Sequence, residues 1–308
     1  MINLNRPLNE LKPQLLAYFR ARAAESLQSI IEKYGDSQYK KRAAAINRQI
    51  TKTEAFLVNN LLQLANRQQW GNVEIINKML MINYTRNIVM LESRNDVWPY
   101  DYMAFSRRIG ELWEPFCKQC FAYPLNEIEL FIPPLFSQVK QALHAEIESY
   151  IDQLAITPAQ RLDLKQYYQK VWRLAAAGEI QLELDLHFIS VAGQRINVDF
   201  KSGFGSNEKG NTNRLLMVAA VYQSLDALYD CVLLVRSEED KNNHYLQTLK
   251  NSAGWDAYCG SEAYRKIHEY SGFNLKSWIE TYMDWENDFR ADTLQHFRDN
   301  DLVQYLSW

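Results

Sequence analysis

The repeat of apolar residues changes its period near Gly178, and this change constrains the fold more than any other feature of the sequence. Before Gly178, apolar side chains recur every three or four residues, which is typical of amphipathic helices. After it, they alternate with polar residues, which is typical of strands with one buried face. The chain is therefore expected to have a helical first half and a second half of the α/β class.

Helical periodicity predicts helices over residues 8–34, 38–68, 72–92, 135–154 and 157–177. Gly35 follows the first of these, at a position where glycine commonly ends a helix. Thr157 and Gln160 can form a capping box around Pro158 at the start of the last one. The segment 94–134 is interrupted by several prolines and is expected to be less regular.

Composition argues against two classes of protein. No stretch approaches the ~20 consecutive apolar residues that span a bilayer, so no membrane partner is expected and the chain is placed in the cytoplasm. Four cysteines among 308 residues are too few for a disulfide framework. They are expected to be free thiols in the core.

Basic residues are concentrated in one part of the helical half. The formal net charge of the whole chain is −3, but residues 37–91 carry eight basic residues and only two acidic ones. A local excess of this kind indicates a surface that faces phosphate groups. The candidates for binding DNA are Lys40, Lys41, Arg42 and Arg48. The alternative is an ordinary solvated helix face.

Two alternating segments after Gly178 are expected to form a β-hairpin with a turn at Ala192-Gly193. Directly opposed residues of an antiparallel pair point to the same face, so polar residues must oppose polar residues if both apolar sets are to reach one core. Centring the turn near Ala192 gives three polar pairs, which are His187 with Asn197, Asp185 with Asp199, and Glu183 with Lys201.

This register would hold two carboxylates close together. Asp185 and Asp199 repel each other unless a cation lies between them. Mg²⁺ is the usual cation, because it binds through one or two carboxylates and a substrate phosphate. Lys201, on the same face, can contact a phosphate oxygen or orient the attacking water. The residues predict a phosphodiester hydrolysis site, whereas the alternative is an exposed strand with a weak Glu183–Lys201 surface ion pair.

A glycine-rich loop, an apolar helix and a continuous apolar strand follow Lys201. A strand, a helix and a buried strand in this order predict a parallel pairing through a right-handed crossover. Polar residues in and just after the loop are further candidates for contacts with DNA, namely Asn207, Lys209, Asn213 and Arg214. An ordinary polar loop fits the same residues.

The hairpin residues resemble the signature of the PD-(D/E)xK nuclease superfamily. In that family an acid on one strand is followed, after a short hairpin, by acid-x-Lys on the next, and here Asp185 precedes Asp199-Phe200-Lys201 by fourteen residues. The strand, strand, helix, strand order over about residues 157–240 also resembles the family's core. The resemblance implies a restriction-endonuclease-like core, a central mixed sheet with flanking helices, behind a large α-helical N-terminal region. Asp185 and Asp199 would bind Mg²⁺, and Lys201 would act in catalysis.

Two assignments within this site stay open. Glu183 competes with Asp185 as the first acid and is kept as a candidate catalytic residue. Some members of the family place a further glutamate on a preceding helix, and Glu146, Glu148 or Glu179 would supply it here.

The function implied by the resemblance is that of a type II restriction endonuclease, an Mg²⁺-dependent enzyme that cuts double-stranded DNA. A homodimer is expected, because a twofold assembly matches a palindromic site. Residues 1–155 would form a helical region for DNA binding or dimerisation, and residues 156–308 would form the catalytic domain. Two alternatives remain. A nucleotidyltransferase could use Glu183, Asp185 and Asp199 as its three acids, and a non-catalytic helical DNA-binding or interaction protein would use the hairpin only as scaffold.

Overall fold

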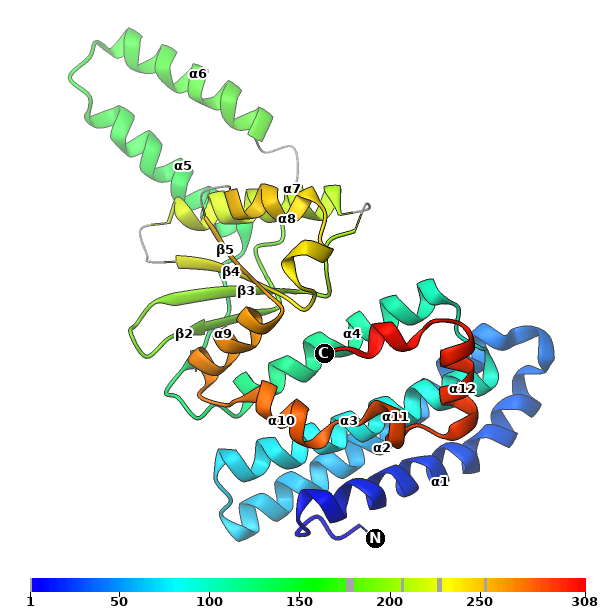
Figure 1. Cartoon of the computed structure of the whole chain (residues 1–308). Coiled ribbons are helices and arrows are strands. Elements are labelled where there is room, and N and C mark those ends of the chain that lie inside the picture. The colour runs from blue at the N-terminus through cyan, green and yellow to red at the C-terminus, as the bar shows by residue number, and fades with distance from the viewer. Residues whose placement is uncertain (1, 176–179, 206–207, 226–228, 252–253) are drawn as a thin grey trace. The chain divides into compact units, whose positions relative to one another are not determined.

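The computed structural model describes residues 2–175, 180–205, 208–225, 229–251 and 254–308 (Figure 1). The chain divides into two compact units. The helical unit comprises Met1–Glu127, Val235–Glu238 and Cys259–Trp308, and the sheet unit comprises Ile128–Leu234 and Glu239–Tyr258. A helical N-terminal region followed by a mixed five-stranded sheet with flanking helices confirms the expected α/β class.

Long helices dominate the helical unit. Three of them pack against one another, namely α1 (Leu8–Tyr34), α2 (Tyr39–Gln68) and α3 (Asn72–Val97). Their bounds confirm the helices expected from periodicity. The prediction of a less regular segment over residues 94–134 was wrong for α4 (Tyr102–Ala122), which runs through Pro115. The C-terminal helices of this unit are α9 (Ser261–Ser271), α10 (Leu275–Tyr282), α11 (Trp285–Asp288) and α12 (Ala291–Asp299).

A buried carboxylate joins the two ends of the chain within the helical unit. Glu92 of α3 is 1% exposed and accepts two hydrogen bonds from the Arg20 guanidinium, at 2.7 and 2.9 Å. It also accepts the backbone N–H of Arg290 at 2.8 Å. A buried charge is stable only when it is paired and hydrogen-bonded, and Glu92 meets both conditions. The C-terminal segment is therefore part of the same core as α1 and α3.

The start of α4 depends on one side chain. Asp101 is the N-cap residue, and its Oδ1 accepts the backbone N–H of Ala104 at 2.8 Å. Asp101→Ala removes this acceptor and is expected to lower the free energy of unfolding by about 1 kcal/mol. Denaturant unfolding measures the loss. Asp101→Asn keeps a capping oxygen and is the control, so equal losses in the two variants would contradict the capping role.

The sheet unit has the strand order β1-β2-β3-β4-β5. The strands are β1 (Glu129–Leu130), β2 (Leu186–Ile189), β3 (Arg195–Lys201), β4 (Tyr229–Val235) and β5 (Trp255–Cys259). β2 pairs antiparallel with both β1 and β3. β1 and β5 were not expected, because a two-residue strand and a single five-residue strand leave almost no periodic signal.

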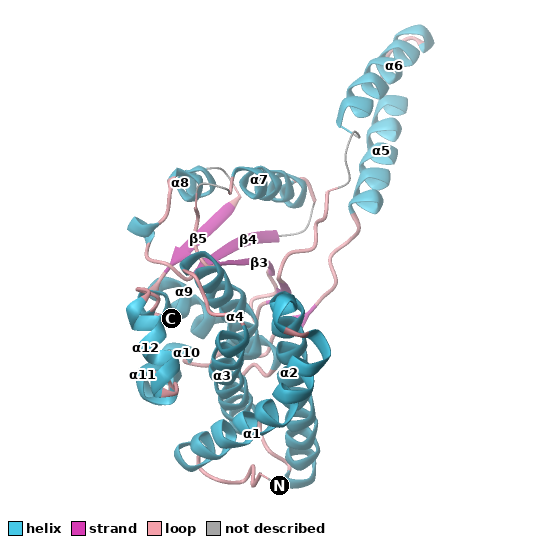
Figure 2. Cartoon of the chain, turned by 90° about the vertical axis from the view of Figure 1, so that its right-hand side faces the viewer, coloured by secondary structure: helices cyan, strands magenta, loops and turns pink. Residues whose placement is uncertain are grey.

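Two pairs of α-helices are described in the sheet unit. α7 (Lys209–Gln223) and α8 (His244–Asn251) lie side by side over one face of the sheet (Figures 1 and 2). α5 (Phe136–Gln153) and α6 (Pro158–Ala175) pack against each other as an antiparallel pair (Figure 2). The capping box expected before α6 is confirmed, since Thr157 N donates to Gln160 Oε1 and Gln160 N donates to Thr157 Oγ1.

The hydropathy of the helices and the state of the cysteines were both expected from composition. No helix among the described residues is long and apolar enough to cross a membrane. The four cysteines are free and buried, as expected. Burial raises the pKa of the Cys120 thiol well above its ordinary value, so this thiol is held neutral.

Candidate active site

The β2–β3 hairpin has the predicted register. Leu186 pairs with Val198, His187 with Asn197 and Phe188 with Ile196. The turn contains Gly193 at φ +79°, in the left-handed region that glycine adopts without strain. The pairing expected from parity is confirmed over the whole length of β2.

The first strand is shorter than its alternating pattern predicted. β2 begins at Leu186, and residues 180–185 are not part of the ladder. The chain bends at Asp185, whose Oδ2 accepts the backbone N–H of Phe200 at 2.7 Å. A side-chain oxygen thus takes the place of a strand carbonyl, and the predicted ladder pairs of Asp185 with Asp199 and of Glu183 with Lys201 do not form. Glu183 is exposed and outside the strand.

Asp199 is the centre of a charged cluster at the end of β3. It is 1% exposed, and its two oxygens contact different cations. Lys201 Nζ forms an ion pair with Oδ2, and Arg214 Nη2 donates to Oδ1 at 3.3 Å. Oδ2 has no aligned hydrogen bond among the described residues, so its contact with Lys201 is an ion pair alone.

Burial controls the ionisation of Asp199. Loss of solvent raises the pKa of its carboxyl to about 6, the positive charge of Lys201 works against this rise, and the nearby Asp185 carboxylate adds to it. Arg214 also favours the ionised form. A buried carboxylate with a shifted pKa, next to two cations and a second carboxylate, is typical of a catalytic or binding site.

His187 lies on the polar face of the hairpin, which the alternating pattern predicted to be open to solvent, and that expectation was wrong. The side chain is 6% exposed and hydrogen-bonded through both ring nitrogens, to Asn197 Oδ1 at 2.7 Å and to the backbone N–H of Leu184 at 2.9 Å. Nε2 accepts from Leu184, so Nδ1 donates to Asn197. Burial lowers the pKa of His187, which keeps the ring neutral. The polar face next to the acids is therefore covered, and Tyr222 of α7 lies over it with its ring centre 6.4 Å from that of His187.

Neither Glu146 nor Glu148 completes the site. Glu146 and Glu148 lie on α5, and Glu148 contacts His144 of the same helix at 3.4 Å. Glu179 lies outside the described residues. No group of three or more His, Cys, Asp or Glu side chains in the described part of the chain could hold a metal ion. The three acids that a nucleotidyltransferase would need, Glu183, Asp185 and Asp199, thus do not form such a group.

The two remaining carboxylates fit Mg²⁺ better than zinc. Zinc sites need three or four protein ligands, whereas Mg²⁺ is held by one or two carboxylates and keeps water or phosphate as its other ligands. Asp199 Oδ2 is buried without an aligned hydrogen bond, and the bond to Phe200 involves only one oxygen of Asp185. Asp185 and Asp199 could therefore hold one Mg²⁺.

The loop-side candidates for DNA contact separate into two groups. Arg214 was expected to contact DNA, but it pairs with Asp199 in the charged cluster. It lies in the second turn of α7, the helix after β3, and this position brings its side chain back to Asp199. Lys209 and Asn213 are exposed on α7. Asn207 lies outside the described residues.

Only part of the basic segment faces solvent. Lys40, Lys41 and Arg48 are exposed on α2, and Arg42 is half-buried. Lys40 Nζ lies 5.9 Å from the ring centre of Trp98, and Lys40 and Lys41 line a hollow of about 470 Å³ at the start of α2. Two other basic residues of the segment are buried or paired within the helical unit. Lys78 is 3% exposed, and Arg86 Nε bonds Glu54 at 2.8 Å.

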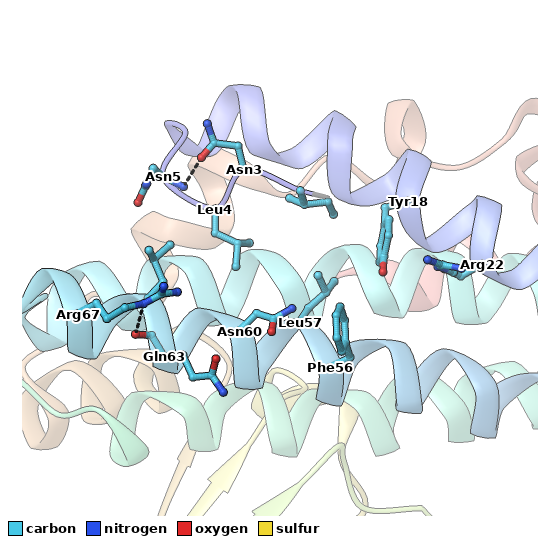
Figure 3. Close-up of a pocket in the computed structure, with 12 residues that line it drawn as sticks. Asn3, Leu4, Asn5, Tyr18, Arg22, Phe56, Leu57, Asn60, Gln63 and Arg67 are labelled. Atoms are coloured by element: carbon cyan, nitrogen blue, oxygen red, sulfur yellow. Dashed lines mark hydrogen bonds between the residues drawn. The ribbon is translucent and has the colours of Figure 1, made fainter.

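A second hollow, of about 750 Å³, lies in the helical unit between the N-terminal segment, α1 and α2 (Figure 3). Leu4 and Leu57 contribute apolar walls, and Arg22 and Arg67 are its charged residues. Arg22 is already paired with Glu25 at 2.7 Å. None of the residues proposed for chemistry or DNA binding lines this hollow.

Comparison of the chain with models of protein families, with curated proteins and with solved structures finds no match. The evidence for what this site does is therefore its own residues and geometry.

Proposed function

We propose that the protein is an Mg²⁺-dependent endonuclease that hydrolyses phosphodiester bonds of double-stranded DNA, in the manner of a type II restriction endonuclease. The observation that carries this proposal is the cluster around Asp199, a buried carboxylate with Lys201 and Arg214 on its two oxygens and Asp185 nearby. The hairpin, the following helix and the next strand support a restriction-endonuclease-like core.

Each residue of the cluster has a role in this proposal. Asp185 and Asp199 would hold Mg²⁺, which when bound polarises the phosphate and lowers the pKa of a water molecule. Lys201 would move from Asp199 to a phosphate oxygen or to the attacking water, and its positive charge would stabilise the negative charge that develops at phosphorus. Arg214 remains on Asp199 Oδ1 and favours the ionised form of that carboxylate. Water would lose a proton to solvent as it attacks phosphorus, the bond to the leaving oxygen would break, and this oxygen would take up a proton from solvent.

The direct test is incubation of the protein with plasmid or bacteriophage DNA and Mg²⁺. Discrete fragments would support a site-specific endonuclease, and random degradation would support a nuclease without sequence specificity. Intact DNA at every Mg²⁺ concentration would contradict the proposal and favour a non-catalytic DNA-binding or interaction protein.

The exposed basic residues at the start of α2 are proposed to contact DNA phosphates. If they do, the triple variant Lys40→Ala, Lys41→Ala, Arg48→Ala should bind all DNA sequences more weakly. The slope of log affinity against log salt should fall by about one unit for each phosphate that the variant no longer neutralises. A matched triple variant at exposed basic residues that already have acidic partners, Arg107, Arg265 and Arg298, is the control. An unchanged slope in the α2 variant would show that the basic surface faces only solvent.

A homodimer is proposed as the active form. Cutting both strands of a palindromic site requires two copies of one active site related by a twofold axis. The chain has one Asp185, Asp199, Lys201 cluster, so one copy supplies one such site.

A further inference from the structure

The α5–α6 pair has polar contacts where two packed helices normally have apolar ones. Lys165 Nζ bonds Asp152 at 2.8 Å, and Arg161 Nη2 donates to the backbone oxygen of Leu154 at 3.0 Å. Nearer the other end, the His144 ring stacks on Tyr168 and Trp172. Over residues 136–172 the only buried side chains are Val139 and Ile151.

Each helix also has a stripe of apolar residues that lies on one side of the pair, away from these contacts. On α5 they recur at the spacing of a coiled-coil seam, as Phe136, Val139, Leu143, Ile147 and Tyr150. On α6 they are Leu164, Tyr167 and Val171. At about 100° per residue, each stripe is rotated by about 100–140° from the contacts between the helices. In an antiparallel pair the two rotations lead to the same side. The result is one continuous apolar face.

This face is open to solvent along α6 and at the end of α5. Tyr150, Tyr167 and Val171 are each 65% exposed, and Leu164 is 39% exposed. Isolated helices of this length are marginal in water, and most of their stability comes from packing an apolar face. Two helices that leave this face uncovered lack their main source of stability, so a partner surface is required.

We propose that the apolar face of α5–α6 docks on the same face of a second copy, forming a four-helix bundle. Charge selects this partner and its orientation. α5 carries one basic residue against three acidic ones, and α6 carries four basic residues against one acidic residue. A twofold axis parallel to the helices places α5 of one copy over α6 of the other, so that unlike charges meet at both edges.

The size of the face sets the expected strength of the dimer. Each helix has 18 residues and is about 27 Å long. Two helices side by side offer on the order of 500 Å² per copy, below the ~800 Å² per partner of a standard interface. The contact is therefore expected to be weak enough to dissociate on dilution. This proposal rests on the homodimer of the proposed function and specifies its interface, and it does not depend on the nuclease chemistry.

One pair of charges tests the orientation. Glu146 lies at the outer edge of α5 and Lys170 at the outer edge of α6, at similar heights along the pair because His144 is level with Tyr168 and Trp172. In the proposed dimer Glu146 faces Lys170 of the other copy. Glu146→Lys or Lys170→Glu alone should raise the dissociation constant about tenfold or more, because each places like charges together twice. The double variant should restore the parent value.

Analytical ultracentrifugation of the full chain without DNA measures these constants. In the same experiment, Tyr167→Ser with Val171→Ser should give a monomer, whereas Met217→Ser, a 52% exposed methionine on α7, should not change the dimer. Circular dichroism confirms that each variant is folded. The proposal would be overturned if the parent protein stays monomeric at all concentrations or dimerises only with DNA. It would also be overturned if the dimer survives the apolar substitutions, or if the double charge variant dimerises no more tightly than the single variants. Failure of DNA cleavage leaves these results unaffected, so the two proposals fail separately.

Discussion

Asp199→Asn is expected to abolish DNA cleavage while DNA binding persists. The substitution keeps the size and shape of the side chain and removes the charge that would bind Mg²⁺. It also removes a negative charge beside the DNA phosphate, so affinity for DNA should stay equal or increase. Single-turnover cleavage and equilibrium DNA binding, measured in the same buffer, give the two quantities.

Stability separates this result from simple unfolding. Burial already disfavours the charged form of Asp199, and the two cations that lose their partner in Asp199→Asn, Lys201 and Arg214, are partly open to solvent. The melting temperature should therefore change little. Asp256→Asn, at an exposed position of β5, is the matched control and should cleave like the parent. Near-normal cleavage by Asp199→Asn would remove Asp199 from the site and leave the nuclease proposal without its central residue.

The register of the hairpin could be predicted because it depends on local chemistry alone. Apolar residues alternate in both strands, and a shift of one residue would turn one set away from the core. The pairing of His187 with Asn197 follows from this parity and is observed.

The end of the first strand could not be predicted in the same way. The pattern of alternation continues back to Leu182, and Leu182 and Leu184 are indeed buried. What ends the ladder is the Asp185 carboxylate, which takes the backbone N–H of Phe200. Competition between a side-chain oxygen and a backbone carbonyl depends on geometry that hydrophobic periodicity does not record.

The larger error was the expectation that the polar face of the hairpin is exposed, because the structure buries it. Polar residues at alternate positions normally indicate a solvent-exposed face, but His187 and Asn197 are buried and hydrogen-bonded to each other and to backbone groups, with Tyr222 of α7 over His187. Buried polar groups of this kind are stable because they are paired. Arg214 was placed with the DNA contacts for a related reason, because its approach to Asp199 depends on the path of the chain between β3 and α7.

Lys201→Ala is expected to slow cleavage by about 10²- to 10⁴-fold, the usual contribution of a group that acts on the attacking water or the developing charge. Lys201 pairs with Asp199 rather than with Glu183, so Lys201→Ala also removes a cation from a buried carboxylate. The pKa of Asp199 should rise further in this variant, and some stability at neutral pH should be lost, with Arg214 limiting the loss.

Metal binding distinguishes catalysis by Lys201 from mere pairing with Asp199. Removing a cation that competes for the carboxylate should leave Mg²⁺ affinity equal or higher at a pH above the pKa of Asp199, and calorimetry measures it without DNA. Single-turnover cleavage at saturating Mg²⁺, below the melting temperature of the variant, then measures chemistry alone. Glu183→Ala is the control, because Glu183 is exposed and outside the strand, and it should cut at close to the parent rate. A Lys201→Ala protein that binds Mg²⁺ and also cuts like the parent would show that the lysine only neutralises Asp199, because a residue that stabilises the transition state cannot be lost without a loss of rate.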